Sequence, residues 1–358
     1  MYYLLLSIYK IYICLNLFIL KLIRIFVFMG GTAIKTITTR RYSVEEYERL
    51  LPEILDMSKG MFSKMHPTTY FKSKDSFGDM DILCLIDKEE SEYIELIKNT
   101  FNPRGISKNH NVISFEYKDL QIDFILTIEE NWETSKIYYS YNDLSQYIGK
   151  IANQFGLKFG VEGFKYKVGN VNVIITKDHN LALQFLGFNS DRYNKGFDSM
   201  DEIYEFVMSS KYFHPDFFKL ENLSKVQQER DSRRKNYMRF LELMELSKVK
   251  KPFFYPDPIV YLGKVEEYFP GFLENLHSIT SKLQSEKERQ KEKYNKIYSL
   301  YNGLILKEKL GISSVDLGLY MMNFREFFGS KDLLDDYIYS TDNQETIIEK
   351  FKEVNKLK

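Results

Sequence analysis

The sequence contains little cysteine, with only Cys14 and Cys84 among 358 residues. Two cysteines cannot form a disulfide framework or a cysteine-rich zinc site. The histidines are scattered singly along the chain and lack the spacing of metal ligands. These absences exclude a disulfide framework and a zinc cluster, and a reducing compartment is the simplest interpretation.

Net charge is absent as well. Lysine and arginine total 50, as do aspartate and glutamate, so the formal net charge is +0. Such a chain is not expected to act through nonspecific binding of nucleic acid, although a local basic groove is compatible with a neutral total. With 44% hydrophobic and 28% charged residues, the chain is predicted to fold into two or three packed domains.

A long uninterrupted hydrophobic run is also missing. Residues 1–28 are very apolar, but Lys10, Lys21 and Arg24 divide them into stretches shorter than the ~20 residues that cross a bilayer. They also lack the small-residue cleavage site of a signal peptide. We expect translation to start at Met29 and to give a cytoplasmic protein without stable membrane association, in the host cytoplasm if the protein is viral. The alternative is a membrane anchor or interfacial helix at residues 1–28.

Residues 43–130 are predicted to form a small α+β unit with a mixed sheet and helices on one side of it. Ser43 and Glu46 form a capping box in front of apolar positions at helical spacing, and β-branched and aromatic residues mark the strands. The expected elements are a helix (43–62), two strands (68–74 and 79–86), a helix (88–101), a loop (102–111) and two strands (111–127) that turn at Lys118-Asp119.

The remainder is predicted to be mostly helical, with one hairpin that turns at Gly169-Asn170. Pro252, Pro256 and Pro258 indicate a linker at 249–262. The expected elements are helices at 141–156, 178–188, 199–210 and 222–247, the hairpin at 161–176, and a long charged helix at 276–311.

Three acidic residues stand where a buried strand should have none. Asp79 and Asp81 begin the apolar run DMDILCLI, and Asp123 interrupts LQIDFIL. Alternate residues of a strand face the same way, so Asp79 and Asp81 project side by side and repel unless a cation intervenes. Carboxylates suit Mg²⁺, and we expect all three to converge on it. The alternatives are a turn cap at Asp79 and a surface position for Asp123.

This pattern resembles the DNA polymerase beta-like nucleotidyltransferase superfamily, which carries a Gly-Ser pair, an Asp-x-Asp strand and a third Asp on a neighbouring strand. The match covers residues 65–127, but Lys72-Ser73 occupies the place of the Gly-Ser pair, without its glycine. The resemblance implies a palm-like core in which the three aspartates are catalytic and hold two Mg²⁺ or Mn²⁺ ions. It also implies contacts to a nucleoside triphosphate from four residues: Lys72, Ser73, Lys74 and Gly78.

A broader resemblance runs from Gly30 to about Phe240. The segments that carry it are GGTAIKTITTRRYSVEEY, FGDMDIL, SYNDLSQYIGKIANQFGLKFG and LGFNSDRYNKGFDSMDEIYEFVMSSKYF. Together they are similar to a group of nucleotidyltransferase-like proteins of phages and large DNA viruses. That similarity implies a shared fold.

Further nucleotide contacts are expected beyond the predicted core. Tyr141 is a candidate for packing on a base, Asn142 for a ribose hydroxyl and Lys150 for the triphosphate; the alternative for Asn142 is a helix N-cap. Two basic clusters are candidates for phosphate-backbone contacts, with a solvated surface as the alternative. These clusters are Arg40-Arg41 and the group Arg230, Arg233, Arg234 and Lys235.

The predicted function is metal-dependent transfer of a nucleoside monophosphate to a hydroxyl group, at the 3′ end of a nucleic acid such as RNA or tRNA. The alternatives are a protein or small-molecule acceptor, and a catalytically degenerate binding module. The predicted organisation is an apolar leader (1–28), an N-terminal arm and helix (29–64), a catalytic core (65–134), a helical nucleotide- and acceptor-binding domain (135–248), the linker (249–262) and a C-terminal helical domain (263–358).

Overall fold

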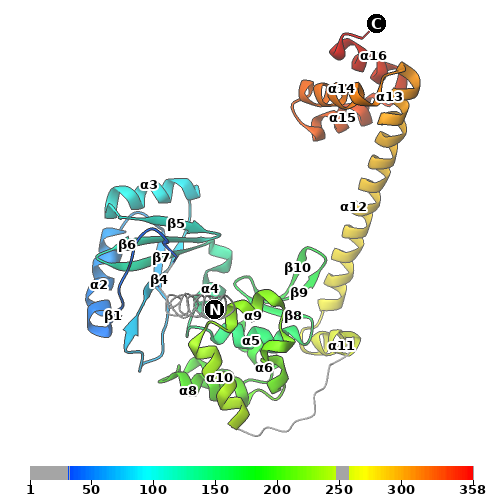
Figure 1. The fold of residues 1–358 in the computed structure, drawn as a ribbon. Helices are drawn as coiled ribbons and strands as arrows, with labels where there is room; N and C mark the ends of the chain where they lie inside the picture. The colour runs from blue at the N-terminus through cyan, green and yellow to red at the C-terminus, as the bar shows by residue number, and fades with distance from the viewer. Residues whose placement is uncertain (1–30, 32, 247–257, 358) are drawn as a thin grey trace, which may run out of the picture. The chain divides into compact units, whose positions relative to one another are not determined.

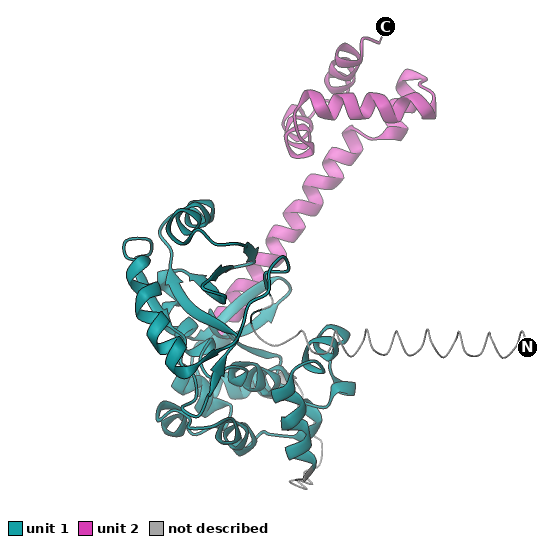
Figure 2. Cartoon of the chain, turned by 60° about the vertical axis from the view of Figure 1, so that its left-hand side comes forward, with its two compact units in different colours: residues 1–273 teal, residues 274–358 magenta. Residues whose placement is uncertain are grey.

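The computed structural model describes residue 31, residues 33–246 and residues 258–357. The predictions for the leader, for Met29 and for most of the linker therefore lie outside the described residues. The chain divides into two compact units, residues 1–273 and residues 274–358 (Figure 2). The first contains all the predicted site residues.

The first unit is built on a five-stranded sheet of order β2-β4-β7-β6-β5 (Figure 1). β4 and β7 run parallel at its centre, and the other neighbouring strands are antiparallel. The sheet is therefore mixed, and the α+β class is confirmed. Its strands are β2 (Lys64–Pro67), β4 (Asp79–Leu85), β5 (Ile106–Asn109), β6 (Val112–Tyr117) and β7 (Leu120–Thr127).

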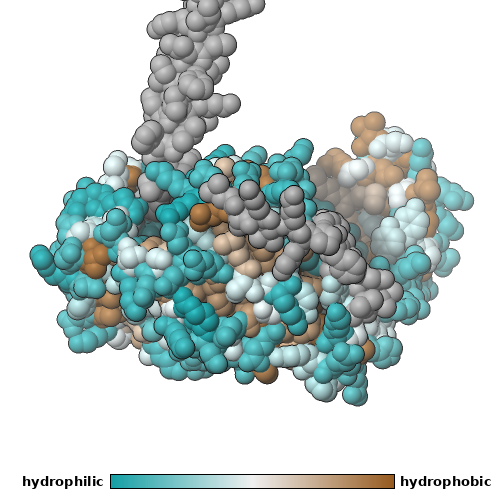
Figure 3. Space-filling view, turned by 90° about the horizontal axis from the view of Figure 1, so that it is seen from below, coloured by the Kyte–Doolittle hydropathy of each residue, from teal (hydrophilic) through white to brown (hydrophobic). Residues whose placement is uncertain are grey.

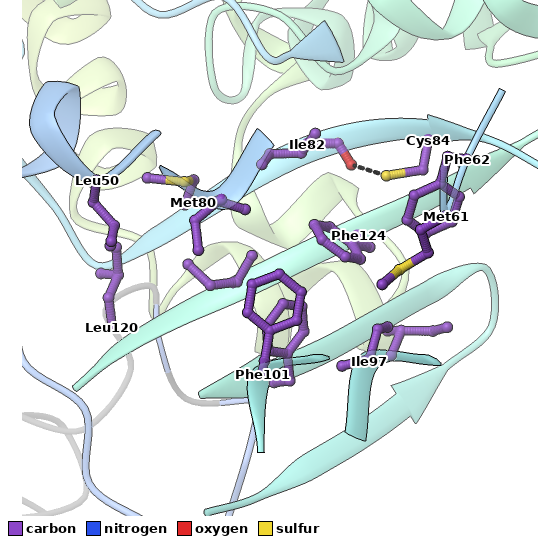
Figure 4. Close-up of a cluster of buried hydrophobic side chains, with 14 of the residues drawn as sticks. Leu50, Met61, Phe62, Met80, Ile82, Cys84, Ile97, Phe101, Leu120 and Phe124 are labelled. Atoms are coloured by element: carbon purple, nitrogen blue, oxygen red, sulfur yellow. Dashed lines mark hydrogen bonds between the residues drawn. The ribbon is translucent and has the colours of Figure 1, made fainter. Parts of the chain in front are cut away.

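One face of this sheet packs against α2 (Val44–Met57) and α3 (Glu90–Phe101), as Figure 1 shows. The alternate residues Met80, Ile82 and Cys84 of β4 point into that core, together with the even-numbered residues of β7 (Figure 4). Helices on one side of the mixed sheet were expected, and this packing confirms them. The period of two then requires the odd-numbered residues of β4 and β7 to face the other way.

The opposite face is only partly covered. Leu83, Leu85 and Ile125 pack there against Trp132, the first residue of α4 (Trp132–Tyr138). Asp79 and Asp81 lie on this face, nearer the start of β4. The helix thus covers the apolar part of the face and leaves the acidic part beside a cavity.

Local signals in the sequence explain several of these elements. The Ser43 hydroxyl accepts from the Glu46 N–H while the Glu46 carboxylate accepts from the Ser43 N–H, so the predicted capping box is present at the start of α2. Lys118 and Asp119 both have positive φ, 51° and 64°, which is the geometry of a tight hairpin turn with the matching twist. The predicted turn between β6 and β7 is therefore confirmed.

Two predictions in this region are wrong. Residues 68–74 are not a strand, because the edge strand β2 lies before them and the N–H groups of Lys72 and Ser73 donate to the carbonyls of Phe197 and Asp198 instead. Residues 102–111 are not only a loop, because β5 pairs there with β6. A further short pair joins β1 (Tyr42–Ser43) and β3 (Ser76–Phe77).

After α4 the first unit continues with helices around a three-stranded sheet of order β10-β9-β8. The predicted hairpin forms β9 and β10 with its turn at Gly169, and β8 was not predicted. The predicted helix at 222–247 is two helices, α9 and α10. The elements are α5 (Leu144–Asn153), β8 (Leu157–Gly160), β9 (Gly163–Val168), β10 (Val171–Thr176), α6 (His179–Phe185), α7 (Ser190–Asn194), α8 (Met200–Ser209), α9 (Lys225–Asp231) and α10 (Lys235–Leu246).

The first unit also includes α11 (Pro258–Tyr268), so the last part of the predicted linker is helical. The Tyr261 ring packs on Phe155 with 4.3 Å between ring centroids, which ties α11 to the residues that follow α5. The sequence favoured a linker there because three prolines precede or begin the helix. Pro258, however, occupies the first position of α11, where a missing N–H is not needed.

The second unit is a helical bundle with its own core of Leu306, Phe324, Ile338, Ile347 and Phe351. The long charged helix predicted at 276–311 ends earlier, because Asn302 caps a new helix by accepting from the N–H groups of Leu304 and Ile305. Its helices are α12 (Phe272–Leu300), which begins in the first unit, α13 (Gly303–Leu310), α14 (Ser314–Phe327), α15 (Lys331–Thr341) and α16 (Gln344–Asn355).

On the face seen in Figure 3, hydrophilic side chains cover much of the surface, with hydrophobic ones between them. Among the described residues, none of the helices combines the length and hydropathy needed to cross a bilayer.

Candidate active site

Two adjoining cavities open where β4 begins. The first has a volume of about 420 Å³ and is lined by all three predicted acids, Asp79, Asp81 and Asp123. The second, of about 840 Å³, shares Asp79 and Asp81 with the first, together with Lys74 and Asn142. Asp79 and Asp81 therefore lie where the two cavities adjoin, and Asp123 lies in the first; we call the two cavities together the cleft.

The pairing of the two central strands brings the acids together. In the parallel register Asp81 lies opposite Asp123, and Asp79 lies opposite Gln121. Directly paired residues on neighbouring strands point to the same side of a sheet, and neighbouring strands are about 4.8 Å apart. The expected common facing of the three aspartates is confirmed, and all three line one cavity, whereas their convergence on shared Mg²⁺ ions stays a prediction.

The carboxyl groups in this cavity are all shifted towards the protonated form. Burial raises the pKa of Asp81 well above its ordinary value, and the charges of Asp79 and Asp123 raise it further. Burial and the Asp79 charge raise the pKa of Asp123 to about 7. Burial also raises the pKa of Asp79, against the opposing pull of Lys74. The positive charges of Lys74 and Arg41 offset the rise at Asp79 only in part, so additional positive charge would favour the ionised carboxylates.

Two of the acids are hydrogen-bonded to protein donors. The Gly31 N–H donates to Asp79 Oδ2 at 3.2 Å. Gln121 Nε2 donates to Asp123 Oδ1 at 2.9 Å and to Oδ2 at 3.0 Å. Ser114 lies opposite Asp123 on β6 and opposes the rise in the pKa of this carboxyl. In the described part of the chain, no three His, Cys, Asp or Glu side chains stand in a metal-ligating arrangement. The three acids thus share a cavity, and two of them, Asp79 and Asp123, accept hydrogen bonds from other residues of the protein.

The donor set nevertheless fits a hard divalent cation. Mg²⁺ and Mn²⁺ prefer carboxylate oxygens, and an ionised carboxylate has about four acceptor positions. The hydrogen bonds of Asp123 leave some of these positions free, and none of the three acids forms an ion pair among the described residues. The raised pKa values mean that burial and mutual repulsion disfavour the ionised carboxylates, and a bound cation would oppose both effects.

Lys74 is the basic residue that lines both cavities. Its ammonium lies 4.3 Å from the centroid of the Phe77 ring. Burial lowers the pKa of Lys74, whereas the charges of Asp79 and Asp81 oppose that shift. A partly desolvated ammonium interacts strongly with a negative charge, so Lys74 is suited to bind a phosphate group.

The other residues of the predicted phosphate turn are placed differently. Gly78 lines the second cavity. Lys72 and Ser73 line neither cavity: both are exposed, their N–H groups donate to Phe197 and Asp198 carbonyls, and the Lys72 ammonium lies 2.6 Å from Asp198 Oδ1. The prediction that Lys72 and Ser73 contact the nucleotide therefore finds no support in this geometry.

Tyr141 and Asn142 form a strained turn at the edge of the cleft. Both have positive φ, 57° and 58°, which is uncommon for residues other than glycine and often marks a functional site. Asn142 lines both cavities, as a substrate-contacting residue would. Tyr141 instead packs against Phe197 with 4.9 Å between centroids and lines neither cavity. The alternative N-cap role of Asn142 is wrong, because α5 has Asp143 at that position.

Lys150 does not lie in the cleft. Its ammonium is 2.8 Å from Asp231 Oδ2, and the two side chains are 5% and 1% exposed. Arg230 bonds the same carboxylate at 2.7 Å. The prediction that Lys150 contacts a triphosphate is therefore wrong, because its ammonium is buried in an ion pair that joins α5 to α9.

Basic residues in α9, at the start of α10 and between these two helices line the second cavity. Arg234 also pairs with Asp143, and Lys235 is exposed. Arg41 faces the same cavity and donates to Ser76, whereas Arg40 pairs with Glu46 away from it. We call this cationic set the basic wall; its members are Arg41, Arg230, Arg233, Arg234 and Lys235.

Two functional candidates were missed by the sequence analysis. Gly31 has φ 94°, and a Cβ there would lie 2.3 Å from the Gly78 carbonyl oxygen, so its backbone passes close behind the site. Gln121 is 2% exposed and bonds Asp123. Its position two residues before Asp123 on the same strand was a usable signal, whereas no local pattern linked Gly31 to the acids.

No protein-family model matches this chain, and no curated protein shows significant similarity to it. Its function is therefore inferred from the cleft and its residues.

Proposed function

We propose that the protein is a nucleotidyltransferase that moves a nucleoside monophosphate from a nucleoside triphosphate to the 3′ hydroxyl of a nucleic acid, RNA or tRNA. The five-stranded sheet would then correspond to the palm-like core of the superfamily that the sequence resembles. The observation that carries the proposal is the register of β4 and β7, which brings Asp79, Asp81 and Asp123 to one cavity.

Asp79, Asp81 and Asp123 would hold two Mg²⁺ or Mn²⁺ ions. When bound, such ions neutralise phosphate charge and lower the pKa of a hydroxyl. Lys74 would donate to phosphate oxygens, and Asn142 would bond the sugar. The acceptor oxygen forms a bond to the α-phosphorus as the bond to pyrophosphate breaks. The acceptor proton would pass to Asp123, which lines the same cavity as the other two acids.

The basic wall favours a nucleic-acid acceptor over a protein or a small molecule. Its cations flank the same cavity that contains Asp79 and Asp81, so a chain of phosphates would be held beside the reacting groups. The neutral net charge of the chain is compatible with a nucleic-acid acceptor, because the positive charge of the basic wall acts locally on the phosphates.

A non-catalytic nucleotide- or nucleic-acid-binding module is the second candidate. The engagement of the Lys72 and Ser73 N–H groups favours it, since those groups would otherwise be available to phosphates. The full chain, each labelled nucleoside triphosphate and Mg²⁺ or Mn²⁺, incubated with total RNA, DNA or protein, distinguishes the candidates. Label in RNA supports the proposal, label in protein or a small molecule changes the acceptor, and binding without transfer supports the module.

We expect Lys74→Met to weaken nucleoside triphosphate binding about 10-fold, because a charge-assisted contact in a partly desolvated site is lost. Fluorescence titration with a labelled nucleotide measures this. Lys72→Met is the matched control, because that ammonium pairs with Asp198 outside the cavities. An equal loss in both variants would place the phosphates elsewhere.

We expect the double variant Arg233→Glu, Lys235→Glu to weaken single-stranded RNA binding and to reduce the salt slope of log K by roughly two. Lys287→Glu with Lys291→Glu on α12 is the control, because these exposed lysines line neither cavity. Filter binding at several salt concentrations measures both. Unchanged RNA binding in the first variant would contradict a nucleic-acid acceptor held by the basic wall.

A further inference from the structure

The chain segment before β1 contacts side chains at the acidic cavity. We call its described residues, 31 and 33–41, the N-terminal arm. Besides the Gly31 N–H on Asp79, the arm places the Ala33 N–H 2.8 Å from Gln121 Oε1. Through these two N–H groups, the arm contacts Asp79 directly and also contacts Gln121, the side chain that hydrogen-bonds Asp123.

The Ala33 contact determines which end of the Gln121 amide faces Asp123. A glutamine side chain has one acceptor oxygen and one nitrogen that carries two donor hydrogens. A backbone N–H can only donate, so it fixes Oε1 on the arm side. Nε2 must then point the opposite way, where it donates to both oxygens of Asp123. With Gln121 2% exposed, water does not provide an alternative partner.

The arm is itself held in place. Ile34 is 3% exposed and contacts the position of Gly105, where an added Cβ would lie 2.8 Å from Ile34 Cγ2. The Arg40 N–H donates to the Asp119 carbonyl at 2.8 Å, which ties the end of the arm to the turn between β6 and β7. The Thr39 hydroxyl donates to the Gly31 carbonyl at 2.7 Å.

We propose that the N-terminal arm is part of the active site: through Ala33 and Gln121 it orients the Asp123 carboxylate, and through Gly31 it orients Asp79, for divalent-cation binding. Gln121 is thus a positioning residue. This inference rests on the proposed function, because it assigns the cation to the same acids. Partners that orient metal ligands typically change metal affinity 10- to 100-fold when they are removed.

The test measures Mn²⁺ binding to the full chain by electron paramagnetic resonance, without nucleotide or turnover. Ala33→Pro removes the N–H that orients Gln121, and Ala33→Gly is its matched control because it keeps that N–H. Gln121→Met removes both amide contacts at similar length. We expect Ala33→Pro and Gln121→Met each to weaken Mn²⁺ binding 10- to 100-fold, and Ala33→Gly to change it little.

The double variant Ala33→Pro, Gln121→Met decides whether the two residues act together. If the arm works through Gln121, the double variant binds Mn²⁺ about as weakly as either single variant, since contacting residues are not additive. Additive losses, or unchanged binding in the single variants, would overturn the arm proposal. A wild-type chain that binds no Mn²⁺ would instead overturn the proposed function. Circular dichroism establishes that each variant is folded. Gly31→Ala disturbs the arm at a second position, because the added Cβ would clash with the Gly78 carbonyl oxygen.

Discussion

Asp81→Asn is expected to abolish nucleotide transfer, with a loss on the order of 10³-fold or more, because it removes the central carboxylate of the three. Asp81 lies between the other two, paired with Asp123 across the strands and two residues from Asp79. Asparagine keeps the size of the side chain but not its charge. Transfer of labelled nucleotide under saturating Mg²⁺ measures the loss.

The same substitution is expected to stabilise the metal-free protein. The folded-state pKa of Asp81 lies above its unfolded value, as does that of Asp123, so the folded protein binds protons that the unfolded chain releases. Stability should therefore fall as pH rises from about 4 through about 7. Asp81→Asn removes part of this dependence, and we expect the Tm at pH 8 to rise by roughly 2–5 °C.

Mg²⁺ with nucleotide should raise the Tm of the wild-type protein by mass action, and this gain should vanish in Asp81→Asn. Asp56→Asn is the control, because Asp56 is exposed on α2 and pairs with Lys59. Residual transfer near the wild-type rate in Asp81→Asn would contradict the catalytic role. If the metal-free Asp81→Asn protein had a lower Tm than the metal-free wild type, repulsion among the three carboxylates would be contradicted.

Lys150→Met is expected to lower the free energy of unfolding by about 3 kcal/mol, because it leaves the Asp231 carboxylate with Arg230 as its remaining ion-pair partner in a buried position. Burial raises the pKa of Asp231, but hydrogen bonds from Arg230 and Lys150 outweigh it and the pKa is lowered. The carboxylate is therefore charged at neutral pH and needs both partners. Urea unfolding followed by circular dichroism measures the change.

Nucleotide affinity separates this structural role from a binding role. If Lys150 only holds α5 against α9, nucleotide affinity of the folded Lys150→Met protein stays within about twofold of wild type, within the scatter of a distant substitution. Lys158→Met on β8 is the control, because this lysine is exposed. A large loss of affinity with little loss of stability would restore the triphosphate role that the sequence suggested.

The acids and their relation were predictable because short-range geometry determines them. The spacing of Asp79 and Asp81 sets their common side through the period of a strand, and an isolated acid at Asp123 among apolar residues marked a second strand. The capping box at Ser43 and the turn at Lys118-Asp119 were predictable for the same reason: each involves residues within four positions of one another.

The failures have one physical cause, which is contact between distant parts of the chain. Residues 68–74 have the composition of a strand, yet two of their N–H groups bond to residues 197 and 198 rather than to a sheet. Lys150 looked available on a helix surface, yet α9 supplies Asp231 as a buried partner 81 positions later. Propensity and spacing carry no information about such partners.

The sequence by itself therefore determined three carboxylates on two strands, a nearby lysine and a mixed α+β core. Tertiary structure decided which cations and donors meet those carboxylates. Lys74 and Asn142 line the cleft, whereas Lys72 and Lys150 lie outside it in ion pairs. The basic wall lines the second cavity. Gly31 hydrogen-bonds Asp79 although the two residues are 48 positions apart in the sequence. The side of the sheet to which a strand residue points follows from the alternation of neighbouring residues. The neutralisation of a buried charge depends instead on the residues that the whole fold packs against it.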